Sequence, residues 1–196
     1  MAYLELARQF DQAAESVSQR LNRTVHALNT ADVDYAVIGV NAVDLWLNTV
    51  GSGVKTNNVN ILLRRSDIDL ATEALSTEGF TRKDVGDHTM YLDEPNARFE
   101  NAIHVLFAGE KYSADSLEPT PGVEDHKVLN GVRVINLLAF VKMKLTAGRS
   151  KDLGHLIELL KAGVISDSMI ERIPESLRSR FQEVLLEREA TRQVWE

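Results

Sequence analysis

Apolar residues recur at steps of three and four positions near the start of the chain. The series is Phe10, Ala14, Val17, Leu21, Val25 and Leu28. This spacing puts the apolar side chains on one face and predicts an amphipathic helix over residues 3–28. The apolar face must cover another surface. That surface is either the rest of the same chain or, given the near-heptad spacing, the same helix of a second copy in a homodimer.

Short runs rich in β-branched and other apolar residues predict the strands of one mixed sheet. These runs cover residues 35–38, 58–63, 80–83, 89–92, 102–107 and 132–135. Helical spacing predicts helices over residues 41–50 and 66–79, and the second would begin with a capping box made by Ser66 and Asp69. The acidic, proline-containing segment 109–130 reads as a long surface loop.

The C-terminal third is predicted to be helical. Asn136 can cap a helix that runs to Leu145, because an asparagine side chain accepts hydrogen bonds from the free N–H groups of a first turn. Further helices are expected over residues 151–161, 168–172 and 175–188. The pattern predicts an α+β protein, in which a mixed β-sheet is flanked by helices. We expect a core of residues 1–135, which includes the N-terminal helix, and a C-terminal helical subdomain of residues 136–196 packed on it.

Composition excludes several classes of protein. The 196 residues are 44% apolar and 26% charged, which is typical of one globular unit, and no stretch approaches the roughly 20 apolar residues of a membrane helix. The first residues lack the basic and apolar segments of a secretory signal. The absence of cysteine excludes thiolate metal sites and fits a cytoplasmic location. A formal charge of −7 argues against broad binding of nucleic acid.

Two asparagines, Asn58 and Asn60, lie two residues apart in a predicted strand and therefore share one face. An acidic pair at this spacing would hold Mg²⁺ for phosphoryl transfer. An amide pair holds it poorly, because a neutral oxygen does not offset the cost of dehydrating the ion. Another spaced pair, Asp67 and Asp69, lies in a segment of helical spacing, where residues two apart diverge.

The order of strand, Gly39, helix, Thr56, spaced polar pair and later paired helices resembles the nucleotidyltransferase superfamily over roughly residues 33–165. In particular, the chain is similar to small bacterial proteins related to the toxin partner of type IV toxin–antitoxin systems. The resemblance implies a nucleotidyltransferase-like fold for the mixed sheet. It also implies a cleft that takes a nucleoside triphosphate or a protein partner.

The resemblance assigns nucleotide contacts to a set of small, polar and cationic residues. They are Gly39, Asn41, Lys55, Thr56, Lys142, Lys144, Arg149 and Lys151. Two family positions on this side depart from the pattern, because Val40 replaces a small residue of the phosphate-binding turn and Val54 replaces an arginine. Taken singly, Lys142 and Lys144 are equally well explained as solvated helix residues, and Asp152 as a helix cap.

The family's catalytic carboxylates correspond to Asn58, Asn60 and His104 in this chain. None is anionic, and imidazole suits transition metals better than Mg²⁺. The resemblance therefore implies a degenerate enzyme without a cofactor, with Mg²⁺ expected only if activity is retained. An engineered exchange of aspartate for asparagine would explain the pair alone. The independent changes at Val40, Val54 and His104 favour natural divergence.

Two alternatives remain open from the sequence. One is an active enzyme with atypical metal ligands, using His104 with Asp44, Asp67 or a nearby glutamate. The other is a structural interaction module without nucleotide, dimeric through its N-terminal helix.

Overall fold

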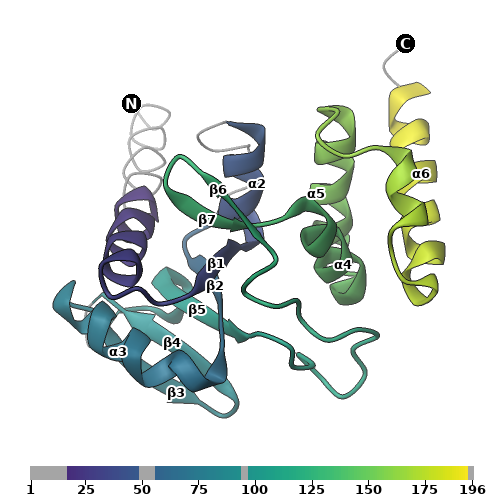
Figure 1. The fold of residues 1–196 in the computed structure, drawn as a ribbon. Helices are drawn as coiled ribbons and strands as arrows, with labels where there is room; N and C mark the ends of the chain where they lie inside the picture. The colour runs from purple at the N-terminus through teal and green to yellow at the C-terminus, as the bar shows by residue number, and fades with distance from the viewer. Residues whose placement is uncertain (1–16, 49–55, 94–96, 194–196) are drawn as a thin grey trace.

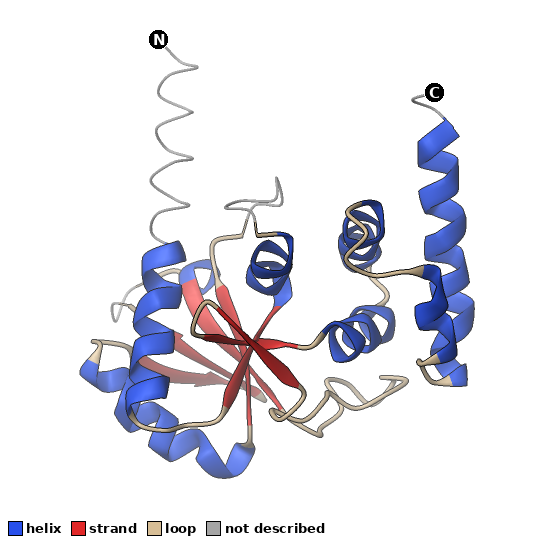
Figure 2. Ribbon diagram, turned by 45° about the horizontal axis from the view of Figure 1, so that its top comes forward, coloured by secondary structure: helices blue, strands red, loops and turns tan. Residues whose placement is uncertain are grey.

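The computed structural model describes residues 17–48, 56–93 and 97–193. These residues form one seven-stranded mixed sheet with helices on both faces, which confirms the predicted fold class (Figures 1 and 2). The strands are β1 Tyr35–Ile38, β2 Val59–Leu63, β3 Thr81–Val85, β4 His88–Leu92, β5 Ala102–Phe107, β6 His126–Leu129 and β7 Val132–Ile135. Their order across the sheet is β3-β4-β5-β2-β1-β7-β6. The β2–β5 and β1–β7 pairs are parallel, and the other neighbours are antiparallel.

Helices cover the sheet on both sides. They are an N-terminal helix that is helical over residues 17–30, α2 Gly39–Leu47, α3 Ile68–Thr77, α4 Leu137–Ala147, α5 Ser150–Lys161 and α6 Glu175–Gln193. Short 3₁₀ turns lie at Arg65–Asp67, Phe99–Asn101 and Asp167–Glu171. The N-terminal helix and α3 lie on one side of the sheet in both views, whereas α4, α5 and α6 lie together on the other (Figures 1 and 2). None of the described helices is long and apolar enough to cross a bilayer.

The core is divided by the sheet into two layers. Strand β1 shows why, since its successive side chains point to opposite faces. Tyr35 and Val37 join the cluster beneath the N-terminal helix and α3. Ala36 and Ile38 join the cluster that contains α4, α5 and α6. Both layers are buried, so this central strand is apolar throughout.

The N-terminal helix covers its own sheet in the part that the structure describes. Val17, Ala27 and Leu28 are buried in the same cluster as Tyr35. The predicted start of this helix, up to residue 16, lies outside the described residues.

One predicted loop was wrong in its last part. Residues 126–129 form β6, which pairs antiparallel with β7 at the edge of the sheet. None of its four residues is fully buried, because an edge strand need not be covered, and Val128 is 62% exposed. The turn that follows consists of Asn130 and Gly131, with φ angles of 51° and 80°. An Asn-Gly pair with positive φ angles is a strong hairpin signal, and it was present in the sequence.

The helix starts were predicted with mixed success. Asn136 caps α4 as predicted, since its Oδ1 accepts a hydrogen bond from Ala139 N at 2.9 Å. The capping box at α3 was wrong. Ser66 Oγ instead donates to Asp67 Oδ1 at 2.8 Å, and a 3₁₀ turn precedes the helix.

Candidate functional site

A cleft of about 810 Å³ lies between the sheet and helices α4 to α6. The sheet contributes the turn from β1 into α2, residues 56–60 and the middle of β5. Helices α4 and α5 form one wall, to which Arg180 of α6 adds its side chain. The opposite wall is the loop over residues 112–120.

The two asparagines of the sheet are hydrogen-bonded to each other within this cleft. Asn60 Nδ2 donates to Asn58 Oδ1 at 2.9 Å. The same oxygen accepts a hydrogen bond from Thr56 Oγ1 at 2.8 Å. Both acceptor positions of this amide oxygen are thus used inside the chain. The pair forms a neutral surface on the floor of the cleft, in which the acceptor Asn58 Oδ1 is satisfied within the chain.

His104 lies beside this pair. It is the register partner of Asn60 on the neighbouring parallel strand, so the two side chains share one face of the sheet. Its Nε2 is 2.9 Å from the carbonyl oxygen of Phe99. Because a carbonyl only accepts, Nε2 carries the proton of this hydrogen bond. The structure therefore brings the three predicted catalytic positions together, and all three line the cleft.

This arrangement does not fit a magnesium ion. Asn58, Asn60 and His104 offer amide groups and an imidazole, whereas Mg²⁺ prefers carboxylate oxygens and water. Among residues 17–48, 56–93 and 97–193, no three His, Cys, Asp or Glu side chains are grouped to hold a metal.

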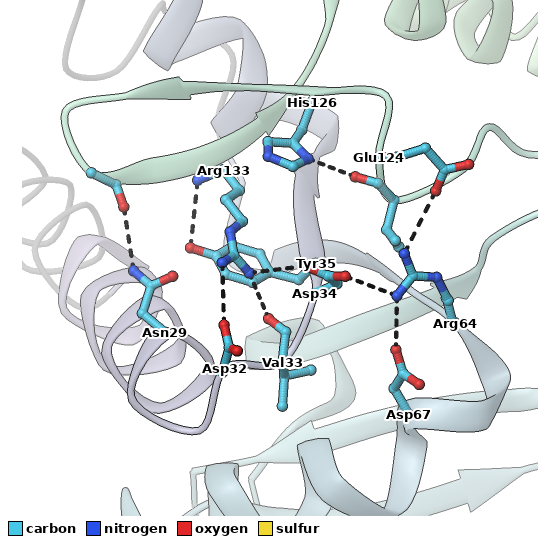
Figure 3. A network of polar contacts seen from close by, with 12 residues as sticks. Asn29, Asp32, Val33, Asp34, Tyr35, Arg64, Asp67, Glu124, His126 and Arg133 are labelled. Atoms are coloured by element: carbon cyan, nitrogen blue, oxygen red, sulfur yellow. Dashed lines mark hydrogen bonds and ion pairs between the residues drawn. The ribbon is translucent and has the colours of Figure 1, made fainter.

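The alternative metal ligands are placed differently. Glu100 lines the cleft near His104, but neither Asp44 nor Asp67 is among the described residues that line it. Asp67 Oδ2 lies 3.3 Å from Arg64 Nη1, in a polar network that also contains Asp34 and Arg133 (Figure 3). Arg64 Nη1 donates to Asp34 at 2.9 Å. This network joins the start of β1 to β7 and to the end of β2.

Gly39 is needed where β1 turns into α2. Its φ angle is +72°, and a Cβ atom there would lie 3.0 Å from Asn60 Nδ2. A larger residue would be strained and would press on the asparagine pair. Gly39 and Val40 thus place the backbone at the start of α2 against the cleft.

A buried ion pair connects α4 to the start of α5. Asp152 is 1% exposed, and its two oxygens each accept a hydrogen bond at 2.6 Å, one from Lys144 Nζ and one from Arg149 Nε. Burial raises the pKa of Asp152, but the hydrogen bond from Arg149 and the charge of Lys144 outweigh it and hold that pKa below its usual value. Burial lowers the pKa of Lys144, which Asp152 only partly offsets.

The predicted nucleotide contacts fall into three groups. Those that line the cleft are Gly39, Thr56, Lys144, Arg149 and Lys151. Lys142 and Asn41 are not among the described residues that line it. Lys55, like Val54, lies outside the described residues.

Two residues of the cleft were not singled out from the sequence. His155 of α5 is 3% exposed, and neither ring nitrogen has a hydrogen-bond partner among the described residues. Burial and the nearby charge of Lys144 lower the pKa of His155 to about 4. Thr146 Oγ1 of α4 is also buried and unpartnered within the described chain. The one available signal was the position of His155, a single helical turn after Asp152.

Charge is unevenly distributed around the cleft. The cations Lys144, Arg149, Lys151 and Arg180 come from the helical wall. Apart from Asp152, the carboxylates are Glu100, which precedes β5, and Asp115 and Glu118 of the loop over residues 112–120. Glu118 Oε1 accepts a hydrogen bond from Ser176 Oγ of α6 at 2.5 Å, so this loop reaches α6. An anionic ligand group is therefore favoured beside the cations of α4 and α5 and disfavoured beside the loop.

The cations of the helical wall differ in their availability. Lys144 is held by Asp152, and Arg180 Nη1 donates to the carbonyl oxygens of Leu145 and Thr146. Arg149 uses Nε for Asp152 and is 57% exposed. Lys151 is exposed and makes no ion pair with any described residue.

Comparisons with known proteins identify the fold. No protein-family model and no curated protein sequence matches the chain. The antibiotic-resistance factor ANT(2'')-Ia is 12% identical, with a TM-score of 0.53 over 88% of this chain and 94% of its own. JHP933 from Helicobacter pylori is 16% identical, with a TM-score of 0.52 over 81% and 72%. An antigenic nucleotidyltransferase-like protein from Paracoccidioides brasiliensis is 14% identical, with a TM-score of 0.52 over 93% and 91%. The chain therefore has a nucleotidyltransferase-like fold.

Proposed function

We propose that this protein binds a nucleoside triphosphate in the cleft without catalysing magnesium-dependent nucleotidyl transfer. The observation that carries the proposal is the neutral floor made by Asn58, Asn60 and His104. Two-metal phosphoryl transfer needs anionic ligands to fix the ions. At these positions the chain supplies hydrogen-bonded amides and an imidazole in their place.

The phosphates are assigned to the helical wall. Arg149 and Lys151 are exposed at the start of α5 and line the cleft. The first turn of α2 adds free backbone N–H groups at the cleft, where the helix dipole favours an anion. These groups hold a triphosphate by charge and hydrogen bonding and need no metal ion.

A thermal-shift panel of nucleoside triphosphates, with and without Mg²⁺ or Mn²⁺, tests the proposal. The wild type is expected to be stabilised by nucleotide to the same degree in both conditions. The Asn58→Asp/Asn60→Asp variant restores two carboxylates and should gain a metal-dependent part of the stabilisation. Equal metal responses in the two proteins would mean that these positions are not a metal site.

Two lysine substitutions in α5 test whether the phosphates bind at the start of this helix. Lys151→Ala should weaken the nucleotide response, whereas Lys161→Ala removes a lysine from the other end of the same helix, outside the described lining of the cleft, and should leave it unchanged. The absence of catalysis is tested separately with labelled triphosphate. Transfer of label to RNA, protein or a small acceptor by the wild type, above the level of the Lys151→Ala variant, would refute it.

A protein partner is the second candidate for this cleft. Exposed aromatic side chains favour it, because Tyr112, which lines the cleft, is 62% exposed, and Phe99, next to the lining residue Glu100, is 47% exposed. The resemblance to proteins of type IV toxin–antitoxin systems makes the product of the adjacent gene the first partner to test. Co-expression with it should give a complex of defined stoichiometry by light scattering, and Tyr112→Ser should weaken it. Two separate monomers would exclude this partner.

A further inference from the structure

Two buried polar side chains in the cleft lack partners within the described chain. His155 of α5 has two unpartnered ring nitrogens and Thr146 of α4 has an unpartnered hydroxyl oxygen. Leaving one such group unsatisfied costs about 1–3 kcal/mol. Buried polar groups in native proteins are nearly always satisfied, by protein, by water or by a ligand. Both residues line the cleft. Each of the unpartnered atoms exposes less than 1 Å² of surface, so a ligand in the cleft would supply their partners after a shift of the side chains around them.

The chemistry of the pair selects an uncharged ligand group. A neutral imidazole offers one N–H donor and one acceptor nitrogen, and a threonine hydroxyl both donates and accepts. His155 stays neutral at pH 7 because it is buried beside the charged Lys144, with Arg149 and Lys151 also nearby and Asp152 only partly offsetting them. A phosphate offers acceptor oxygens, so it could accept the imidazole N–H but would leave the other ring nitrogen without a donor. A ligand group with both a donor and an acceptor satisfies both nitrogens.

The neighbouring side chains are suited to a planar ring. Met143 and Ala147 of α4 line the same cleft and supply apolar surface, whereas Phe140 beside them is buried in the core with Lys144 Nζ over its ring. Ligand sites commonly combine such apolar walls with a few polar groups that fix orientation. Along α5, His155 follows Lys151 by about one turn, or about 6 Å. The proposed phosphate contacts and this pair therefore lie at successive positions along one wall.

We propose that His155 and Thr146 form a nucleobase subsite, which binds the base through an edge that carries both a donor and an acceptor. The proposal rests on the proposed function, because it assigns the other end of the same nucleotide. It explains the unpartnered polar groups of Thr146 and His155 in the wall of the cleft. It does not extend to Asn41 Oδ1 and Glu158 Oε2, which are also buried without partners among the described residues but lie outside the described lining.

The test separates the base from the phosphates by using three kinds of probe. Isothermal titration calorimetry is performed with the four nucleoside triphosphates, the four nucleosides and inorganic tripolyphosphate. The variants are Thr146→Val, which is close to isosteric, His155→Leu, and His155→Gln, which keeps an uncharged donor and acceptor. His126→Leu is the control, because His126 is a partly buried histidine outside the described lining of the cleft.

We expect the wild type to bind at least one triphosphate more tightly than tripolyphosphate. Thr146→Val and His155→Leu should each weaken that triphosphate roughly tenfold, the effect of losing one buried hydrogen-bond partner, without changing tripolyphosphate binding. His155→Gln should retain most of the affinity, and His126→Leu all of it. The free Thr146→Val protein should melt at the same or a higher temperature than the wild type, because it loses an unsatisfied buried group. If Thr146 had only a structural role, its replacement would not weaken triphosphate binding while leaving the stability of the free protein unchanged or higher.

Three other results would distinguish a failure of the base subsite from a failure of the phosphate site. Equal binding of triphosphates and tripolyphosphate, with no effect of the variants, would retain the phosphate site and overturn the base subsite, leaving water as the partner of His155 and Thr146. Nucleoside binding that depends on His155, without tripolyphosphate binding, would retain the base subsite and overturn the triphosphate assignment. No binding of any probe would overturn both.

Discussion

Asn60 Nδ2 donates a hydrogen bond to Asn58 Oδ1 at 2.9 Å, across the two-residue spacing that would bring paired carboxylates together. Two carboxylates this close repel each other unless a cation or a proton lies between them. The amide pair removes that repulsion and replaces it with an internal hydrogen bond. The floor of the cleft is therefore stable without a bound ion.

The first prediction concerns this hydrogen bond. Asn60→Asp replaces the donor with an acceptor that faces Asn58 Oδ1, so we expect a loss of about 1–3 kcal/mol in unfolding free energy at pH 7 without divalent ions. The loss should shrink below pH 4, where a protonated carboxyl can donate again. Urea denaturation at both pH values measures it. Asn57→Asp adds a carboxylate to the exposed neighbouring residue and should change stability by less than about 0.5 kcal/mol. Equal effects of the two substitutions would contradict the pairing.

The second prediction concerns the buried ion pair. Asp152→Ala leaves Lys144 buried without its partner and should cost about 3–5 kcal/mol of unfolding free energy. Lys144→Met combined with Asp152→Leu should recover most of this loss, because no charge then remains buried between the helices. Glu110→Gln breaks an exposed pair with Arg65 and should cost less than about 1 kcal/mol. Chemical denaturation of the wild type and the three variants measures these differences in unfolding free energy. A double variant as unstable as Asp152→Ala would contradict the prediction.

The third prediction concerns pH. The pKa of His155 is about 4 in the folded protein and 6.5 in the unfolded chain. The unfolded state therefore binds more protons between these values, and the stability that His155 contributes rises with pH across this window. The contribution is complete above about pH 6.5 and is lost, by about 3 kcal/mol in all, as the pH falls to 4.

The variant His155→Gln separates the pH-dependent contribution of His155 to stability from the contribution of titrating carboxylates. The difference in unfolding free energy between the wild type and the variant should change in favour of the wild type from pH 4 to 6.5 and then stay constant to pH 8. A difference that is constant over the whole range would show that His155 titrates normally.

The fourth prediction concerns the turn between β1 and α2. Gly39→Ala should lower the unfolding free energy by at least about 1–2 kcal/mol, because φ is +72° and the new Cβ would press on Asn60. Gly154→Ala is the matched control, since it lies within α5, and beyond its chain neighbours and the backbone of its own helix no atom lies within 4 Å of a Cβ at this position. It should stabilise the helix by about 1 kcal/mol. Thermal melts of the two variants should show a lower melting temperature for Gly39→Ala and a higher one for Gly154→Ala than for the wild type.

Much of the architecture followed from local patterns. The alternation in β5 and the apolar run of β1 predicted buried strands at nearly their observed bounds, and the asparagine at 136 marked the start of α4. Strand β6 was not predicted from the sequence, because a strand at the edge of the sheet is not buried and lacks a continuous apolar pattern. The Asn130-Gly131 turn, which is typical of a hairpin, was nevertheless present in the sequence. The capping box at Ser66 failed because a 3₁₀ turn displaced the start of α3.

The candidate site was only partly accessible from the sequence. The spacing of Asn58 and Asn60 predicted a shared face, because two-residue periodicity is a property of the extended chain itself. The sequence thus determined most of the elements, the neutral character of the asparagine pair and the cationic start of α5. Only the tertiary structure decided that His104 lies beside Asn60, that Asp152 neutralises Lys144 and that His155 and Thr146 are buried without partners. Burial and pairing depend on which strands and helices become neighbours, and that is set by packing between distant segments rather than by any local pattern.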